Sequence, residues 1–484
     1  MALAPGSVAA QTQWLDATAQ AELVASGEVS ALDMVDAAVE RIEALDGPVN
    51  AVIMRWFEHA REVAAADPSG PFAGVPFLLK DLWSHYEGQV LTNGSIALKD
   101  VQPVSSSSTN LVKRFNEAGL VTLGRSSSPE LGSVPVSEAV AYGPTRNPWG
   151  TDHTSGGSSG GAAVAVATGM VPVAHASDGG GSIRIPASCC GLVGLKPTQG
   201  RVSLGPERTE ADLGVDFCVT RTVRDTAKML DAISGPGIGD VIIAPPPSRP
   251  YVDEVGADPG KLRIGILDHH PHGHAVHADC AEAANVAGSL LESLGHDVSP
   301  GFPDALADAS FNARFMALWA VNRAMGINTL SSMAGREMTA DDVDAANWAQ
   351  AEFAKNLTAV DLAQANAAVL AFRRSVHQWW ADGWDLLLTP TLGLPPVKIG
   401  EVDPQPGDPM AGMRKSAEFV PFTPAFNTSG QPAISLPLHW NADGLPIGVQ
   451  LVAAYGREDL LVQVASQLEA AAPWADRKPA LASL

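Results

Sequence analysis

Cysteine is scarce in this sequence, with 4 residues among 484. These cysteines, at positions 189, 190, 218 and 280, show no paired spacing of the kind that zinc sites use. They are also too few for a disulfide scaffold. The adjacent pair Cys189 and Cys190 is interpreted as two small buried residues. The fold must therefore be stabilised by its hydrophobic core rather than by cross-links or structural zinc.

Positive charge is also scarce, because 31 lysines and arginines stand against 53 acidic residues, a formal net charge of −22. Nucleic acids and anionic membrane surfaces are bound through clustered positive charge, so neither is expected as a partner. A neutral or cationic small molecule fits this charge better. The sequence leaves the oligomeric state open, and a homodimer is compatible with it.

No stretch reaches the apolar length of a membrane span. Residues 1–11 lack the basic start and the long apolar core of a signal peptide, and we therefore expect a cytoplasmic protein. A content of 46% hydrophobic and 17% charged residues is ordinary for a globular protein. A chain of 484 residues can bury a large core.

Glycine, in contrast, is concentrated around two serines. Ser158 lies within the sequence Ser-Gly-Gly-Ser-Ser-Gly-Gly at 155–161, and Ser182 lies within Asp-Gly-Gly-Gly-Ser-Ile-Arg at 178–184. Glycine has no Cβ, so it permits tight turns and lets another group approach the backbone N–H closely. A hydroxyl beside such a cluster is typical of a nucleophile with an oxyanion site.

Two other interpretations of the glycine clusters fit less well. A flexible linker would not be followed by residues 162–167, which predict a buried helix, and by 171–176, which predict a buried strand. A phosphate-binding loop of the Walker type ends in Gly-Lys-Ser or Gly-Lys-Thr, and this stretch contains neither. The pattern thus favours catalysis.

The chain resembles the amidase signature family at several motifs. They are Gly-Val-Pro-Phe-Leu-Leu-Lys-Asp at 74–81, Gly-Pro-Thr-Arg-Asn-Pro-Trp at 143–149, both serine loops, Pro-Ala-Ser at 186–188, and the run from Gly191 to Ser203. The resemblance implies an α/β fold with an amidase-signature-type mixed β-sheet core surrounded by helices. It also implies that a helical insertion covers the active site.

The same resemblance implies the catalytic residues. Carried over motif by motif, it makes Ser182 the nucleophile, Ser158 the bridging serine after a cis peptide bond, and Lys80 the base. It further implies an oxyanion hole built from the backbone N–H groups of Gly179, Gly180 and Gly181, with a contribution from Ser182. No cofactor and no metal are expected.

A lysine can act as base only when its amine is neutral, which requires burial to lower the pKa of Lys80. The alternative is a histidine triad using His153 or His175, although His175 lies in an apolar strand, where a hydrogen-bonded core histidine is more common. Asp178 and Arg184 flank the nucleophile loop and are interpreted as structural charges that fix it.

We expect a single domain with four segments. Residues 1–70 form an N-terminal helical arm, 71–304 an α/β core with the catalytic motif, 305–385 a helical substrate-pocket insertion, and 386–484 the C-terminal part of the core. Some aromatic residues of the insertion should line the pocket, from the set Phe311, Phe315, Trp319, Trp348, Phe353, Trp379 and Trp380. The five histidines between 269 and 277 favour an exposed loop over a metal site, because no carboxylate lies at helical ligand spacing.

These observations predict a serine hydrolase of the Ser-Ser-Lys type that cleaves carbon–nitrogen bonds of small linear or cyclic amides through an acyl-enzyme. Residues 14–24 and 452–461 resemble the branch of the family that opens cyclic dimers of 6-aminohexanoate. Two alternatives remain. One is the glutaminase subunit of a tRNA-dependent amidotransferase, and the other is a noncatalytic binding protein on an amidase scaffold.

Overall fold

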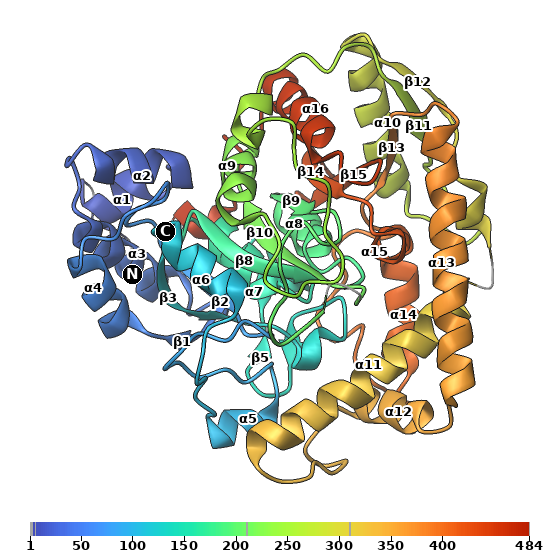
Figure 1. The fold of residues 1–484 in the computed structure, drawn as a ribbon. Coiled ribbons are helices and arrows are strands. Elements are labelled where there is room, and N and C mark those ends of the chain that lie inside the picture. Colours follow the sequence, from blue (N-terminus) through green and yellow to red (C-terminus); the bar gives the residue numbers. More distant parts are fainter. Residues whose placement is uncertain (1–2, 5, 210–211, 309–310, 484) are drawn as a thin grey trace.

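An 11-stranded mixed β-sheet runs through the protein (Figure 1). The computed structural model describes residues 3–4, 6–209, 212–308 and 311–483. In spatial order the strands are β1 (Val52–Arg55), β3 (Val121–Ser126), β2 (Pro76–Lys80), β8 (Val173–Asp178), β10 (Val215–Thr220), β9 (Val193–Lys196), β14 (Ala433–Trp440), β15 (Pro446–Ala453), β13 (Leu386–Pro390), β11 (Arg263–Ile266) and β12 (Asp297–Pro300). Two short ribbons pair β4 (Glu138–Ala139) with β5 (Gly143–Pro144), and β6 (Arg146–Asn147) with β7 (Gly150–Thr154). The expected mixed sheet with surrounding helices is confirmed.

The direction of the strands decides which residues meet at one edge. Strand β2 is parallel to both β3 and β8, whereas β10, β9, β14 and β15 follow in antiparallel order. Because β2 and β8 are parallel, their carboxyl ends lie at the same edge of the sheet. Lys80 ends β2 and Asp178 ends β8, so the structure brings the lysine motif next to the nucleophile loop.

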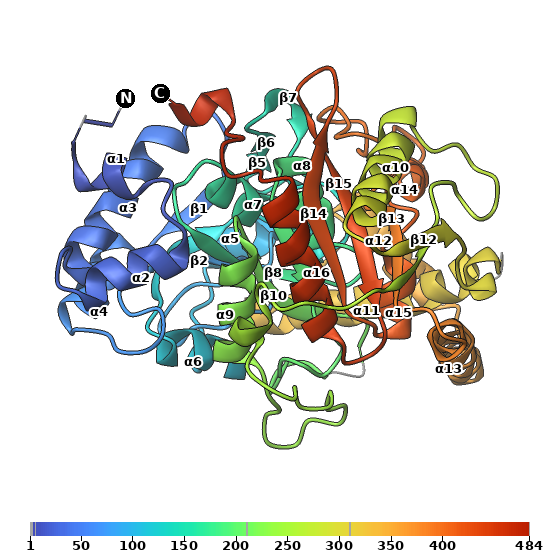
Figure 2. The same cartoon turned by 90° about the horizontal axis from the view of Figure 1, so that it is seen from above.

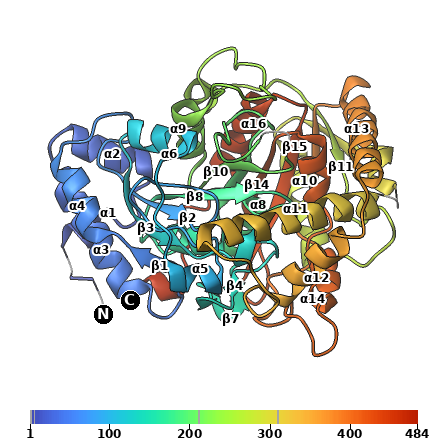
Figure 3. The same cartoon turned by 60° about the horizontal axis from the view of Figure 1, so that its bottom comes forward.

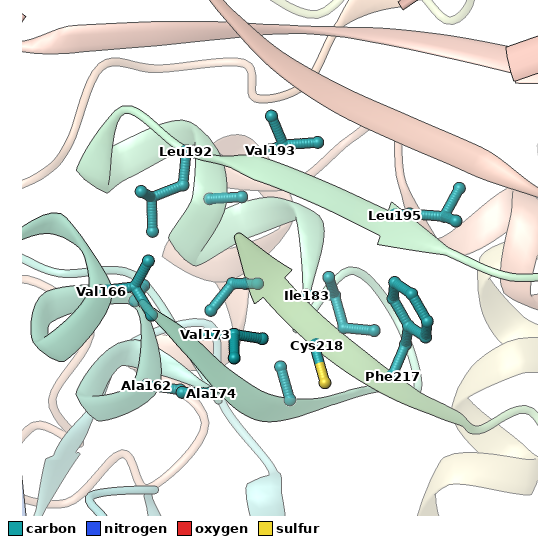
Figure 4. Packing of buried hydrophobic residues seen from close by; sticks show 14 of the residues in the cluster. Ala162, Val166, Val173, Ala174, Ile183, Leu192, Val193, Leu195, Phe217 and Cys218 are labelled. Carbon is teal, nitrogen blue, oxygen red and sulfur yellow. The ribbon is translucent and has the colours of Figure 1, made fainter. Parts of the chain in front are cut away.

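The buried centre lies around helices α7 (Gly160–Ala167) and α8 (Arg184–Cys190). Every residue of α7 is buried, as expected for a helix that is apolar on all sides. Figure 4 shows Ala162 and Val166 of this helix near Val173 and Ala174 of β8, within one core cluster. The helix predicted at 162–167 and the strand predicted near 171–176 are both present.

The N-terminal segment gathers four helices at one end of the molecule (Figures 1 and 2). They are α1 (Val8–Thr12), α2 (Ala17–Ala25), α3 (Ala31–Leu45) and α4 (Phe57–Ala65). Ser30 caps α3 by accepting a hydrogen bond from the Asp33 N–H at 3.0 Å. The segment also contains β1, which pairs with β3 at the edge of the sheet. The prediction of a helical N-terminal segment missed this strand, because four residues are too few to show an alternating pattern.

Three helices confirm the helical character of residues 305–385. They are α11 (Phe311–Ala334), α12 (Ala345–Ala354) and α13 (Ala359–Ala381), preceded by the short turn η3 (Asp304–Ala307). In Figure 3, α11 lies across the front of the molecule with α12 beside it, and the two helices contact each other. Helices α14 (Ala411–Phe419) and α15 (Pro424–Ser429) follow later in the chain.

The remaining helices complete the cover of the sheet. They are α5 (Ile96–Val101), α6 (Asn110–Glu117), η1 (Glu130–Gly132), α9 (Val223–Ile233), η2 (Tyr251–Glu254), α10 (Ala278–Ser293), α16 (Glu458–Ala471) and η4 (Ala480–Ser483). The Gln13 side chain donates a hydrogen bond to the Ala482 carbonyl at 3.0 Å, so the two ends of the described chain meet. Within the ranges that the structure describes, no helix has both the length and the apolar character needed to cross a bilayer.

Candidate active site

Lys80 is fully buried at the end of β2 and points its amine at two serines. Its Nζ donates hydrogen bonds to Ser158 Oγ at 2.7 Å and to Ser177 Oγ at 2.9 Å. Ser177 lies on the neighbouring strand β8 and was not identified from the sequence. The structure thus places the predicted base in direct contact with the predicted bridging serine.

Burial lowers the pKa of Lys80 to about 7, while the carboxylates of Asp216 and Asp178 act in the opposite direction. Asp216 is itself kept ionised, because Arg208, 3.0 Å away, outweighs the effect of burial and lowers the pKa of this carboxyl. An amine with a pKa near neutrality is present in both forms at pH 7. Lys80 can therefore accept a proton, which an exposed lysine cannot do at this pH.

Ser158 lies in the turn between β7 and α7, where the Gly157–Ser158 peptide bond is cis, as the family resemblance implied. Gly132 lies close to the Ser158 hydroxyl. A Cβ added to Gly132 would lie 3.1 Å from Ser158 Oγ and 2.6 Å from Leu82 Cδ2. Gly132 also has a φ of +62°. Glycine at this position leaves room beside the hydroxyl.

Ser182 lies in the turn between β8 and α8 and is 8% exposed. It shares a small cavity of about 50 Å³ with Ser158 and also lines a much larger cavity of about 420 Å³. The preceding Gly181 has a φ of +139°, and an added Cβ there would lie 2.2 Å from Thr423 Oγ1. Only glycine fits between Ser182 and Thr423.

The three glycines before Ser182 differ in how their amides are used. The Gly181 N–H donates to Asp178 Oδ1 at 2.6 Å. Across the described parts of the chain, no acceptor takes the amide hydrogens of Gly179 or Gly180. The Ser182 N–H likewise has no acceptor among the described residues. The amides of Gly179, Gly180 and Ser182 are therefore unpaired at this loop, whereas the Gly181 amide is used within it.

Asp178 and Arg184 form a buried ion pair across the nucleophile loop. Arg184 Nε and Nη2 each donate to the Asp178 carboxylate at 2.9 Å, and Asn427 Nδ2 adds a hydrogen bond at 2.8 Å. Burial alone would raise the pKa of Asp178, but the Arg184 charge outweighs it and lowers the pKa to about 2. The interpretation of these residues as charges that fix the loop is confirmed.

The two histidines of the alternative triad lie elsewhere. His175 is buried, and its Nδ1 accepts a hydrogen bond from the Lys80 backbone N–H at 3.3 Å. Burial lowers the pKa of His175, which favours the neutral ring. His153 lies on β7, where its Nδ1 is 2.8 Å from Asp152 Oδ1. In the described residues, neither histidine has a hydrogen bond to Ser158 or Ser182.

The cavity of about 420 Å³ has mostly apolar walls. Phe315 and Trp319 of α11 line it with their rings stacked 5.3 Å apart, and α14 contributes Met413. Of the other predicted aromatics, Trp348, Phe353, Trp379 and Trp380 do not line it. Phe372 of α13, which was not among those predicted, does line it. The side chain of Phe311 lies outside the described part of the structure. The prediction that some of these aromatics line the pocket is thus confirmed for two.

Comparisons with known proteins identify similar chains. A family model described as amidase matches residues 33–462. The chain is 44% identical over 478 residues to the 6-aminohexanoate-cyclic-dimer hydrolase of Paenarthrobacter ureafaciens, and the match covers 97% of each chain. A solved structure of a 6-aminohexanoate cyclic dimer hydrolase complexed with substrate matches with a TM-score of 0.94 at 43% identity, covering 97% of this chain and 99% of that one. A glutamyl-tRNA(Gln) amidotransferase subunit of Thermotoga maritima matches with a TM-score of 0.74 at 26% identity, covering 96% of both.

Proposed function

The chain belongs to the amidase family, and from that premise we propose that it hydrolyses amide bonds with Ser182 as nucleophile, Ser158 as bridging serine and Lys80 as base. The observation that carries this proposal is the hydrogen bond of 2.7 Å from the buried Lys80 amine to Ser158 Oγ. A base is needed because a serine hydroxyl is a weak nucleophile until its proton is removed.

The first half of the reaction forms the acyl-enzyme. Neutral Lys80 accepts the Ser158 proton while Ser158 accepts the proton of Ser182, whose Oγ attacks the amide carbon. The carbon–nitrogen bond then breaks, and the proton returns through Ser158 to the nitrogen of the leaving amine. The free amides of Gly179, Gly180 and Ser182 stabilise the negative oxygen of the tetrahedral intermediate, and losing one such donor typically costs about 3 kcal/mol.

The second half returns the enzyme to its starting state. Water attacks the ester carbon of the acyl-enzyme and passes a proton through Ser158 to Lys80. The carbon–oxygen bond to Ser182 breaks, and Ser182 regains a proton along the same path. Each cleavage yields one carboxyl group and one amino group and consumes a single water molecule; a linear amide gives two product molecules, and a cyclic amide gives one.

For the substrate we propose uncharged, methylene-rich amides, with the cyclic dimer of 6-aminohexanoate as the first compound to test. Two observations support this choice. The relative at 44% identity carries that compound in its name. The cavity wall is also mainly apolar, and its described lining residues include no carboxylate that could pair with a free ammonium group. A ring without free ends avoids the cost of burying an unpaired charge.

A hydrolysis panel on the purified chain tests the proposal. The panel contains the cyclic dimer, the linear dimer, an aliphatic amide, an anilide and glutamine, with products identified by mass. We expect the cyclic dimer to gain the mass of one water and to react faster than the linear dimer. Faster hydrolysis of the linear dimer would contradict the substrate proposal while leaving the amidase assignment intact.

The likeness to the amidotransferase structure keeps glutaminase activity as a second candidate. Glutamine in the same panel separates the two functions, since a glutaminase of this kind delivers ammonia to partner subunits. Release of ammonia from glutamine, with no reaction of any other amide, would favour the amidotransferase role. The noncatalytic alternative predicts that every compound in the panel is unchanged.

A further inference from the structure

The five histidines between 269 and 277 divide into two kinds in the structure. His269 Nδ1 lies 3.1 Å from Asp268 Oδ1, and His277 Nδ1 lies 3.7 Å from Asp279 Oδ2. His277 also caps the start of α10. The other three histidines are His270, His272 and His274. In the described structure none of them forms an ion pair with a carboxylate.

These three imidazoles converge on one point. One ligand atom from each lies within 4.8 Å of the corresponding atoms of the other two. The ring centroids are 5.3 Å apart for His270 and His272, 4.7 Å for His270 and His274, and 6.5 Å for His272 and His274. Nitrogen ligands on a tetrahedral zinc ion lie about 3.4 Å from one another, since each zinc–nitrogen distance is about 2.1 Å. Side-chain movements of about 1 Å are therefore enough to complete such a site.

A tight turn brings the three rings to the same side of the loop. The Gly273 N–H donates to the His270 carbonyl at 2.9 Å, and Gly273 has a φ of +75°. The preceding Pro271 further restricts the backbone of the turn. Residues 270, 272 and 274 therefore converge although they are not at the spacing of a helical metal motif.

The surroundings of His272 favour its coordination to a metal. Its Nε2 lies 3.1 Å from the Leu306 carbonyl oxygen and can only donate to it, which leaves the lone pair of Nδ1 free. A backbone carbonyl in this position is typical of histidines that bind metals. His270 Nδ1 accepts a hydrogen bond from the His272 N–H at 3.0 Å, so its ring must rotate out of this contact when an ion binds through Nδ1.

We propose that His270, His272 and His274 bind one divalent transition-metal ion, such as zinc, through three imidazoles with a fourth position open. Imidazole is a preferred ligand of zinc, nickel and copper. His270 and His272 also line the large cavity that reaches Ser182, which places the ion at the wall of that cavity. The site is separate from Lys80, Ser158 and Ser182, and it supplies no step of the hydrolysis.

The test measures metal binding directly, on the full chain without an affinity tag. Cobalt(II) serves as the optical probe, because its visible absorption reports on the coordination geometry, and zinc serves as the competitor. We expect one cobalt ion per chain, with the intense visible bands of tetrahedral coordination, and full displacement by zinc. His274 does not line the cavity, so His274→Ala removes one ligand without changing the cavity wall.

Two variants of the same loop distinguish metal binding at this site from nonspecific metal binding elsewhere on the protein. His274→Ala should weaken cobalt binding by at least about tenfold. His269→Ala removes an exposed imidazole that pairs with Asp268, and it should bind cobalt within about twofold of the parent. Circular dichroism confirms that both variants fold. Absence of a saturable site in the parent, or equal weakening by both variants, would overturn the proposal.

Discussion

Arg184 holds both oxygens of the Asp178 carboxylate, with two hydrogen bonds of 2.9 Å between fully buried groups. The two residues stand at the ends of the loop that carries Ser182. Parallel bonds from a planar guanidinium fix both the distance and the orientation of its partner. Ser182, the proposed nucleophile, therefore lies on a loop whose two ends are joined by one ion pair.

Asp178→Asn should destabilise the protein strongly. The change leaves the buried Arg184 charge without its counterion, for which a loss of about 3 to 5 kcal/mol in the free energy of unfolding is typical. Urea unfolding at pH 7 measures the loss. The pKa of Asp178 is lowered to about 2, so its contribution is complete above the unfolded value of 3.8 and disappears as the pH falls through about 2. A loss below about 1 kcal/mol would contradict this prediction.

Ser182→Ala should abolish amide hydrolysis without unfolding the chain, because the change removes one hydroxyl and no core volume. Loss of a serine nucleophile lowers kcat by more than about 10⁴-fold in comparable enzymes. Steady-state kinetics on the best amide of the panel provide the measurement, and thermal unfolding is the control. A fluorophosphonate probe should label the parent at Ser182, and labelling at another serine would refute the assignment.

The hydrolysis rate should rise with pH and then level off. Because Lys80 acts only as the neutral amine and burial lowers its pKa to about 7, kcat/KM should fall about tenfold per pH unit below pH 7 and stay high above pH 8. Lys80→Met keeps an unbranched side chain one atom shorter, without the amine, and should remove this activity. A rate independent of pH between 5 and 9 would exclude Lys80 as the base.

Variants of the two histidines of the alternative triad are the controls for the role of Lys80. His153→Ala removes a partly exposed ring, and His175→Asn keeps an acceptor for the Lys80 backbone N–H. Both should retain hydrolysis within about tenfold of the parent if Lys80 is the base. Loss of activity in a correctly folded histidine variant, together with an active Lys80→Met, would reverse the assignment.

Gly181→Ala should reduce hydrolysis by at least about 100-fold, the cost of displacing one oxyanion donor. The new Cβ would lie 2.2 Å from Thr423 Oγ1, and a φ of +139° is strained for any residue with a side chain. The loop must therefore move, and its amides move with it. Gly47→Ala is the control, since an added Cβ there meets nothing within 4 Å. Equal activity of the two variants would contradict the expectation that the loop is rigid.

Dialysis against EDTA should leave amide hydrolysis unchanged, because the proposed mechanism uses an amine and two hydroxyls and no Lewis acid. Activity before and after dialysis is compared at pH 8 on one amide. Lost activity that zinc restores would place a metal in the reaction and contradict the role of Lys80. His274→Ala in the same assay shows whether any such effect arises at the histidine loop.

The local parts of the site were predictable from sequence because short motifs encode them. Ser158 and Ser182 are marked by adjacent glycines, and Lys80 by its apolar strand and the family motif around it. The helix at 162–167 follows from its uniform apolar composition. In each of these cases the signal lies within about ten residues of the group concerned.

The partners of those groups could not be predicted, because they come from distant parts of the chain. Ser177 meets Lys80 across two parallel strands, 97 positions later in the sequence. Asn427 reaches Asp178 from 249 positions away. No periodicity connects such residues, since tertiary packing alone brings them together. The convergence of three histidines around Gly273 was likewise not predictable, because the loop has no regular structure whose period would place the side chains.

The contacts of Arg184 also bear on when the protein acquires activity during its synthesis. Arg184 donates to the Thr423 carbonyl at 3.0 Å, to Asn427 Oδ1 at 2.6 Å and to Gln450 Oε1 at 2.7 Å. Thr423 in turn donates to the Gly180 carbonyl at 2.6 Å. All these partners are translated more than 200 residues after Ser182. A nascent chain that has not yet reached residues 423–450 therefore lacks the groups that fix the loop of Ser182, and we expect it to be inactive until these residues have been made and have folded onto the loop.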